Sequence, residues 1–182
     1  MGEPAFFAGM LIGIGDVALV SCDNKYVGAF LFSVALLSII KLGLPLYTGR
    51  VGRVVKDKTY LDCVIYLVFN IFGTSIPLVW LILAGKYDQL ASISLIKFSK
   101  SAPELILAAI LCNVLIHVAV RANNDLVTVL CVMMFILCGF EHCIADAPFI
   151  LLCPHPIITL FSIILGNTIG AILTEFLIGE NK

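Results

Sequence analysis

The side chains best suited to chemistry lie together in the middle of an apolar stretch. Residues 139–142 read Gly-Phe-Glu-His, and Asp146 and Pro148 follow in the same stretch. Histidine has an unperturbed pKa of about 6.5, so His142 could donate a hydrogen bond or a proton to a passing anion. The structural alternative is that His142 is a buried histidine that only forms a hydrogen bond with a neighbouring group and has no role in transport. We interpret Glu141 as a structural residue that binds backbone amides freed at a helix break.

A second polar interruption occurs in the first half of the chain. Gly43-Leu44-Pro45 and then Thr48-Gly49 interrupt an apolar run, and Thr48 precedes His142 by 94 residues. Irregular backbone is tolerated inside a membrane only where protein or a water-filled cavity covers it. A proline kink in an intact helix would explain this interruption alone. The two interruptions together favour a pair of broken helices.

Six apolar segments must position these side chains. They cover about residues 5–21, 26–48, 60–84, 103–120, 126–152 and 156–179. At ~1.5 Å per residue, most of them can cross a hydrocarbon layer that is ~30 Å thick. The loops are short and no linker is apparent. We therefore expect one transmembrane domain over residues 1–182, built from six transmembrane helices, with the second and fifth broken.

Composition supports an all-α membrane protein. Of the 182 residues, 61% are hydrophobic and 13% are charged, and the mean hydropathy is +1.11. A soluble domain carries roughly 45–50% apolar and about 25% charged residues, which argues against a soluble globular protein here. The net charge of −1 gives no basic field for nucleic acid. Neither a glycine-rich phosphate loop nor a His-Glu-x-x-His motif occurs, so we expect no enzyme activity and no cofactor.

The seven cysteines form no Cys-x-x-Cys pair and lie mostly in apolar runs, so no metal site or disulfide framework is expected. The first apolar run starts at Ala5 with no basic region before it, and it is interpreted as a retained span.

Lysine and arginine counts then predict the orientation of the chain in the membrane. One side carries Arg50, Arg53, Lys56, Lys58, Arg121 and Lys182, and the other carries Lys25, Lys86, Lys97 and Lys100. This bias predicts both termini on the cytoplasmic side of the cell membrane.

The two halves of the chain show a weak internal repeat. Asn70 with Gly73 and Asn167 with Gly170 form Asn-x-x-Gly elements that lie 97 residues apart. Each half would then hold a helix, a broken helix and a helix with this element. Three spans per half require the halves to run in opposite directions, an arrangement found in transporters and channels with a site near the midplane. Asn-x-x-Gly by itself is equally suited to helix packing.

These elements resemble those of the formate/nitrite transporter family, in the same order and over nearly the whole chain. The similar stretches are residues 139–146, 42–49, 110–115, 8–15 and 166–170, and the Gly-Phe-Glu-His element is the most specific of them. The resemblance implies an aquaporin-like protomer in a homopentamer embedded in a lipid bilayer. Each protomer would have its own pore for a small monovalent weak-acid anion: formate, nitrite, hydrosulfide, acetate or lactate. Protons are possible co-substrates.

The resemblance also implies individual roles. The pore and substrate residues would be His142, Thr48, Asn113 and Lys97, and the constrictions would be formed by Phe32 with Phe135 and by Leu36 with Tyr47. His142 would be the central histidine, and Lys97 would make the outer vestibule positive. The sequence departs from the family pattern with Pro45, Arg50 and Asp146, and with the lack of the usual N-terminal extension, so gating of the family type is not expected.

Two alternatives to an anion pore stay open at this point. The first is an aquaporin-like pore for water or small neutral solutes. The sequence has no paired Asn-Pro-Ala loops, and the central histidine also argues against this alternative. A closed accessory membrane subunit is the other alternative.

Asp16 and Lys41 are ionisable residues inside apolar runs, which makes them functional candidates. They could form a buried ion pair; otherwise Lys41 reaches the membrane interface and Asp16 caps a neighbouring helix.

Overall fold

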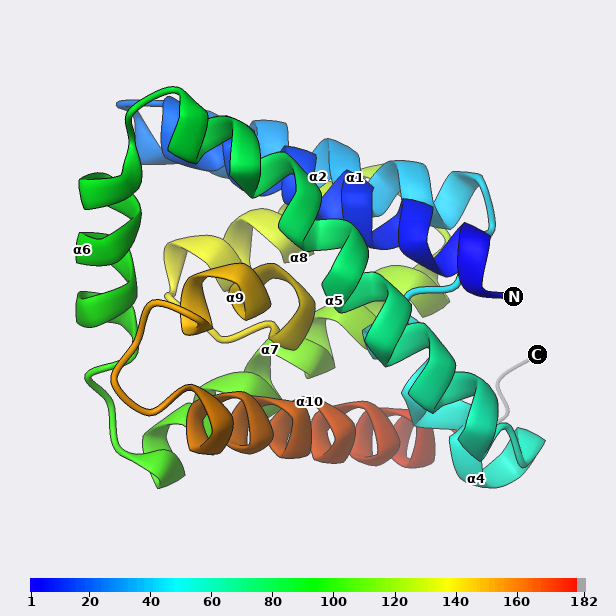
Figure 1. The fold of residues 1–182 in the computed structure, drawn as a ribbon. Coiled ribbons are helices and arrows are strands. Elements are labelled where there is room, and N and C mark those ends of the chain that lie inside the picture. Colours follow the sequence, from blue (N-terminus) through cyan, green and yellow to red (C-terminus); the bar gives the residue numbers. More distant parts are fainter. Residues whose placement is uncertain (180–182) are drawn as a thin grey trace.

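The computed structural model describes residues 1–179, so Lys182 of the charge count lies outside the described residues. All regular structure in this part of the chain is helical (Figure 1). The elements are α1 (Gly2–Ser21), α2 (Lys25–Lys41), α3 (Tyr47–Arg50), the 3-10 helix η1 (Val51–Arg53), α4 (Val54–Asp57), α5 (Tyr60–Leu83), α6 (Tyr87–Lys97), α7 (Ala102–Ala122), α8 (Asp125–Leu137), α9 (Cys143–Ile150) and α10 (Pro156–Ile178).

Four of these helices, α1, α5, α7 and α10, are long and apolar enough to cross a membrane. The apolar segments 26–48 and 126–152 do not form continuous helices. The first is divided into α2 and α3, and the second into α8 and α9. Gly43 and Gly139 lie just past the ends of α2 and α8 with φ angles of +65° and +67°. Only glycine adopts this left-handed conformation without steric cost, so both breaks begin with the same backbone device.

The long helices pack in two close pairs, α1 with α5 and α7 with α10. Each pair is held together at one of the matched glycines. A Cβ built on Gly73 would lie 2.0 Å from the carbonyl oxygen of Phe6, and one on Gly170 would lie 2.4 Å from that of Ile110. These distances leave no room for a side chain. The glycine of each Asn-x-x-Gly element therefore permits backbone contact between the helices, which is how membrane helices commonly pack.

The ends of the bundle differ. Figure 1 shows α6 crossing one end, while α4 lies at the other end together with the start of α1 and the end of α10. In the same view α5 and α10 run in opposite directions. Both described termini of the chain therefore lie at the α4 end.

Of the two alternatives for Asp16 and Lys41, the structure does not form the ion pair. Lys41, the last residue of α2, pairs instead with Asp125 at the start of α8, and both side chains are about half exposed. Asp16 is only 3% exposed and lies near the other end of the bundle, where it faces a cavity also lined by Lys97. A short turn joins the end of α1 to the start of α2. Asp16 lies near this turn, whereas Lys41 lies at the far end of α2, so the two residues are near opposite ends of the bundle.

Replacing Gly170 tests the packing of α7 against α10. We expect Gly170→Leu to lower the thermal unfolding temperature and to destabilise the protein by at least ~1–3 kcal/mol, the cost of overpacking a core. Gly49→Ala is the matched control, since a Cβ at Gly49 meets only the Val120 side chain, at 3.4 Å. A Gly170→Leu protein as stable as the control in detergent would contradict the close crossing.

Candidate functional site

The two breaks bring Thr48 and His142 into contact. Oγ1 of Thr48 lies 3.0 Å from Nε2 of His142, and the residues are 0% and 2% exposed. His142 caps the N-terminus of α9, because its Nδ1 accepts a hydrogen bond of 3.2 Å from the backbone N–H of Ala145. In a neutral imidazole only one nitrogen carries a hydrogen. Nε2 must therefore carry it and donate to Thr48.

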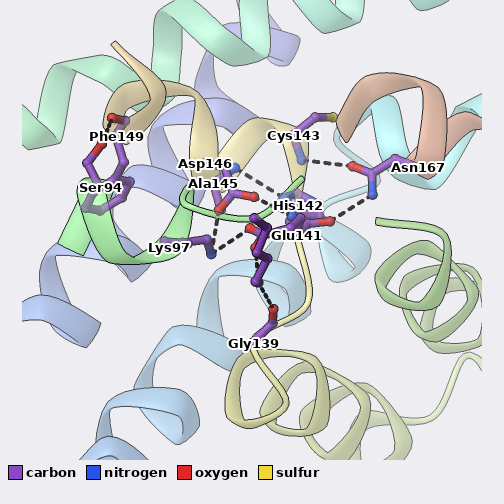
Figure 2. A network of polar contacts seen from close by, with 11 residues as sticks. Ser94, Lys97, Gly139, Glu141, His142, Cys143, Ala145, Asp146, Phe149 and Asn167 are labelled. Atoms are coloured by element: carbon purple, nitrogen blue, oxygen red, sulfur yellow. Dashed lines mark hydrogen bonds and ion pairs between the residues drawn. The ribbon is translucent and has the colours of Figure 1, made fainter. Parts of the chain in front are cut away.

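Asn167 closes the second break from α10. Its Oδ1 accepts from the N–H of Cys143 at 2.8 Å, and its Nδ2 donates to the carbonyl oxygens of Glu141 at 2.9 Å and Ala109 at 2.8 Å. Figure 2 shows the side chain of Asn167 between Cys143 and the residues before it. One amide side chain thus satisfies the backbone on both sides of the break and joins it to α7.

Asn70 closes the first break from α5 in the same way. Its Oδ1 accepts from the N–H of Tyr47 at 2.8 Å, and its Nδ2 donates to the carbonyl oxygens of Pro45 at 3.1 Å and Ala5 at 2.6 Å. Tyr47 and Pro45 precede Cys143 and Glu141 by 96 residues each. The Asn-x-x-Gly elements therefore perform the same task in the two halves of the chain.

Asn113 links the two breaks to each other. From α7 its Nδ2 donates to the carbonyl oxygen of Thr48 at 3.2 Å and to that of Asn167 at 2.7 Å. Its Oδ1 is buried and has no hydrogen-bond partner within the described residues. The structure thus places Asn113 beside the Thr48–His142 pair, where the sequence predicts it.

A group of charged side chains surrounds the second break. Nζ of Lys97 lies 2.7 Å from Asp146 Oδ1 and 3.2 Å from Glu141 Oε2, while Nζ of Lys100 lies 2.6 Å from Glu141 Oε1 (Figure 2 labels all of these except Lys100). Burial opposes the charge on Lys97, but the carboxylates of Asp146 and Glu141 outweigh it and hold the pKa of Lys97 above its ordinary value. Lys97 is therefore charged and already paired.

The expected partners of Glu141 are wrong. Its carboxylate binds the two lysine ammonium groups. The freed amides go to other side chains: the N–H of His142 donates to Asp146 Oδ2 at 2.7 Å, and that of Cys143 donates to Asn167. Asp146 therefore has the capping role that we assigned to Glu141, because it lies one helical turn after His142 on the same helix.

Aromatic side chains cover one side of His142. The rings of Phe135 and His142 stack with centroids 5.9 Å apart and an interplanar angle of 22°. Phe32 meets Phe135 edge-on, with centroids 6.0 Å apart. These contacts come from α2 and α8, the long parts of the two broken helices. The predicted constriction pair Phe32–Phe135 is therefore in contact, and it also touches the histidine.

Two cavities approach this centre from the two ends. The first, the lysine cavity, has a volume of about 450 Å³; its lining includes Asp16, Phe32, Lys97, Phe135, His142 and Asp146. The second, the arginine cavity, has a volume of about 340 Å³; its lining includes Leu36, Arg50, Arg53, His117 and Arg121. Phe32 and Leu36, one turn apart on α2, line different cavities. Tyr47, the first residue of α3, is buried, and its hydroxyl oxygen lies 2.8 Å from Thr168 Oγ1.

Residues 1–179 contain no group of three or more histidine, cysteine or acidic side chains arranged to hold a metal ion.

Sequence reasoning missed the roles of Asp146 and Lys100, and it treated Asn70 and Asn167 only as repeat markers. The matched position of the two asparagines relative to the two breaks was the signal that could have identified them. Lys100 had no comparable signal, since it lies in a polar loop.

Comparisons with known proteins identify the family and the fold. A family model described as "Formate/nitrite transporter" matches residues 4–179. A solved structure described as a "Pentameric formate channel with formate bound" has a TM-score of 0.79 and 22% identity, and the match covers 97% of this chain and 93% of that one. An "FNT family ion channel" has a TM-score of 0.80 and 22% identity, with coverage of 98% and 89%. A search of curated proteins found no match.

The hydrogen bonds of His142 predict its tautomer. We expect the neutral ring to carry its hydrogen on Nε2 and to leave Nδ1 bare, since Nδ1 accepts from Ala145. The measurement is solid-state nitrogen NMR of protein labelled in its three histidines, in lipid vesicles. His142→Asn identifies the signals by their loss. A protonated Nδ1 in the neutral ring would show that α9 is capped differently.

Proposed function

The chain belongs to the formate/nitrite transporter family, and on that premise we propose that it carries small monovalent weak-acid anions across the cell membrane. The substrate class is that of formate, nitrite, hydrosulfide, acetate and lactate. The observation that carries the proposal is the buried contact between His142 Nε2 and Thr48 Oγ1, 3.0 Å long, where two broken helices meet between two cavities.

An anion must lose most of its water to pass this centre, which costs several kcal/mol unless a donor replaces the water. In the proposed mechanism, Nε2–H of His142 supplies that donor by turning from Thr48 to the anion. Thr48 can then supply its own hydroxyl hydrogen. Asn113 holds the two breaks together around the site. For proton transfer, His142 must first take up a proton from bulk water on Nδ1, which then releases the N–H of Ala145, and pass the Nε2 proton to the anion, so that the ring returns to its neutral form. The neutral acid then crosses without the cost of a charge.

Apolar side chains form the barriers on either side in this proposal. Phe32 and Phe135 would form the barrier on the side of the lysine cavity, whose lining they share with His142, and Leu36 with Tyr47 would form the barrier on the other side, where Leu36 lines the arginine cavity. These residues are all buried, with exposures between 1% and 6%. Such barriers strip water from small anions and exclude larger solutes. Glu141 keeps a structural role, because it fixes Lys97 and Lys100 beside the break.

We further propose that the chain forms one transmembrane domain over residues 1–182, with six spanning segments in two inverted halves and an aquaporin-like protomer. The equivalent hydrogen bonds of Asn70 and Asn167, and the opposite directions of α5 and α10 in Figure 1, support this arrangement. A homopentamer is supported by the similar fold of a channel described as pentameric. The arginine-rich α4 end, where both described termini lie, is proposed to face the cytoplasm.

A flux experiment tests the function and the role of His142 together. The purified protein is placed in liposomes, and entry of formate, nitrite and hydrosulfide is measured across a pH series for the wild type and for His142→Asn. Asparagine keeps a polar donor of similar size but cannot titrate. We expect the variant to lose most of the pH dependence of anion flux and to retain roughly a fifth of the flux at neutral pH, since one hydrogen bond contributes ~1 kcal/mol.

Size-exclusion chromatography and native mass spectrometry provide the assembly control for both proteins. A wild type that assembles as a pentamer and moves none of the three anions would refute the proposed function. An unchanged pH profile in a correctly assembled His142→Asn protein would instead assign His142 a structural role.

Removal of Lys97 tests the electrostatics of the lysine cavity. Lys97 offsets the charges of Glu141 and Asp146, and the cavity also contains Asp16. We expect Lys97→Ala to reduce formate flux most strongly at low ionic strength, because salt screens charges beyond ~8–10 Å. Water permeability should change little. The control is Lys97→Ala combined with Asp146→Asn, which removes one of the two carboxylates that Lys97 offsets and should restore part of the flux. An equal loss at all salt concentrations would indicate a structural role for Lys97.

A further inference from the structure

Asp16 is a buried carboxyl group that the described part of the chain leaves without a partner. It lies in the second half of α1, is 3% exposed, and lines the lysine cavity. Its Oδ2 is buried and has no hydrogen-bond partner within residues 1–179, whereas Oδ1 is not closed off in this way and can be reached from the cavity. Buried polar atoms are nearly always paired, so the bare Oδ2 indicates a missing proton or partner.

The ion pairs around the cavity leave Asp16 as the surplus carboxylate. Nζ of Lys97 is bound by Asp146 and Glu141, and Nζ of Lys100 is bound by Glu141. Two ammonium groups therefore meet two carboxylates, and their charges compensate one another. An ionised Asp16 would add a third, uncompensated negative charge beside the proposed path of an anion. An isolated carboxylate is so costly to remove from water that it commonly takes up a proton instead.

The remaining surroundings of Asp16 supply no free cation. The titratable and charged side chains at the cavity are Asp16 on α1, Cys22 in the turn after it, Lys97 on α6, Lys100 in the next loop, and His142 and Asp146 at the second break, with Glu141 behind the lysines. Among the described residues, α2 and α8 give only apolar side chains to this lining, and α5 gives none. Asp146 and Lys97 have opposite charges, so they act on Asp16 in opposite directions.

We propose that Asp16 is a proton-exchanging group of the lysine cavity, which holds a proton in the absence of substrate and passes it to a weak-acid anion that enters from this end. The inference rests on the proposed function, because the anion that receives the proton is the one that then passes His142. In this step the O–H bond of the Asp16 carboxyl group breaks, and an O–H bond forms on the substrate. The Asp16 carboxylate then takes up a proton from bulk water through the cavity, and nothing is oxidised or reduced.

A carboxyl group is chemically well matched to this exchange. The unperturbed pKa of aspartic acid is about 3.9, whereas that of imidazole is about 6.5. Formate, acetate and lactate are themselves carboxylates, so transfer from Asp16 replaces one carboxyl O–H bond by another and is close to balanced in free energy. The substrate would then reach Phe32 and Phe135 as a neutral acid, which avoids the cost of a charge between apolar side chains. His142 would need to donate only a hydrogen bond to it.

Formate flux across a pH series tests the exchange. Asp16→Asn is nearly isosteric but has no proton to release, and we expect it to lower formate flux by at least about tenfold at neutral pH, since positioned proton transfer contributes factors of this size or larger. The loss should shrink as the pH falls, because bulk water then supplies more formate that is already protonated. Asp16→Glu keeps a carboxyl group and should restore part of the flux together with the pH dependence of the wild type.

The matched control is Asp23→Asn, the same substitution at an exposed residue in the turn between α1 and α2, outside the cavity lining. An Asp16→Asn protein that behaves like Asp23→Asn, in liposomes where the wild type moves formate, would overturn this inference alone. An equal loss at every pH would overturn it as well, because it would assign Asp16 a packing role. A gain in flux would show instead that Asp16 is ionised and repels the anion.

Infrared spectroscopy tests the proton site without relying on transport. A protonated carboxyl group has a C=O stretching band that a carboxylate lacks. In lipid vesicles at neutral pH without formate, we expect the wild type to show this band, with a shift on carbon-13 labelling of aspartate. Asp16→Asn should lose the band and Asp23→Asn should keep it. If the wild type moves no formate, the proposed function fails, and the infrared result decides by itself whether Asp16 holds a proton. A wild type without the band, or an unchanged band in Asp16→Asn, would overturn the proposal.

Discussion

The structure depends on one constraint: a helix that breaks inside a membrane exposes backbone groups that no water can satisfy. Each break leaves an N–H at the start of the short helix and carbonyl oxygens before it. Asn70 and Asn167 satisfy both kinds of group with one amide each and also bind a carbonyl of a neighbouring helix. An amide is the only side chain type with an acceptor and two donors in one plane. Each asparagine therefore fixes where its break lies.

This constraint also limits what the centre can offer to a substrate. The N–H groups of His142, Cys143 and Ala145, at the start of α9, are used by Asp146, Asn167 and the Nδ1 atom of His142 respectively. The dipole of α9 still favours negative charge, but these amide hydrogens are not free to bind it. What remains at the centre is the hydrogen shared between His142 Nε2 and Thr48 Oγ1. In the proposed mechanism, this one exchangeable hydrogen bond between apolar side chains is what binds the substrate.

Sequence reasoning could predict the two breaks, because glycine, proline and charge inside apolar runs are costly unless covered. The partnership of Thr48 with His142 came from the resemblance to the family. Sequence reasoning could not predict which side chains meet around the breaks. Position along a span is visible in the sequence, but rotation about the helix axis and the tilt between helices are not. Hence the sequence left open whether Asp16 and Lys41 pair, which they do not, and it gave Glu141 the place that Asp146 takes beside the first N–H of the break. The contribution of Lys100, from a loop, required the folded chain.

The unequal charge of the two cavities follows from the same packing. Where the second break meets α6, Lys97 must offset the buried carboxylates of Glu141 and Asp146, so its charge serves the fold before it can serve an anion. The first break needs no such group, because Pro45 stands at the position equivalent to Glu141 and has neither charge nor N–H to satisfy. The arginines that follow this break, Arg50 and Arg53, keep much of their charge for the cavity. A repeat that is nearly symmetric in its backbone contacts is therefore asymmetric in its electrostatics.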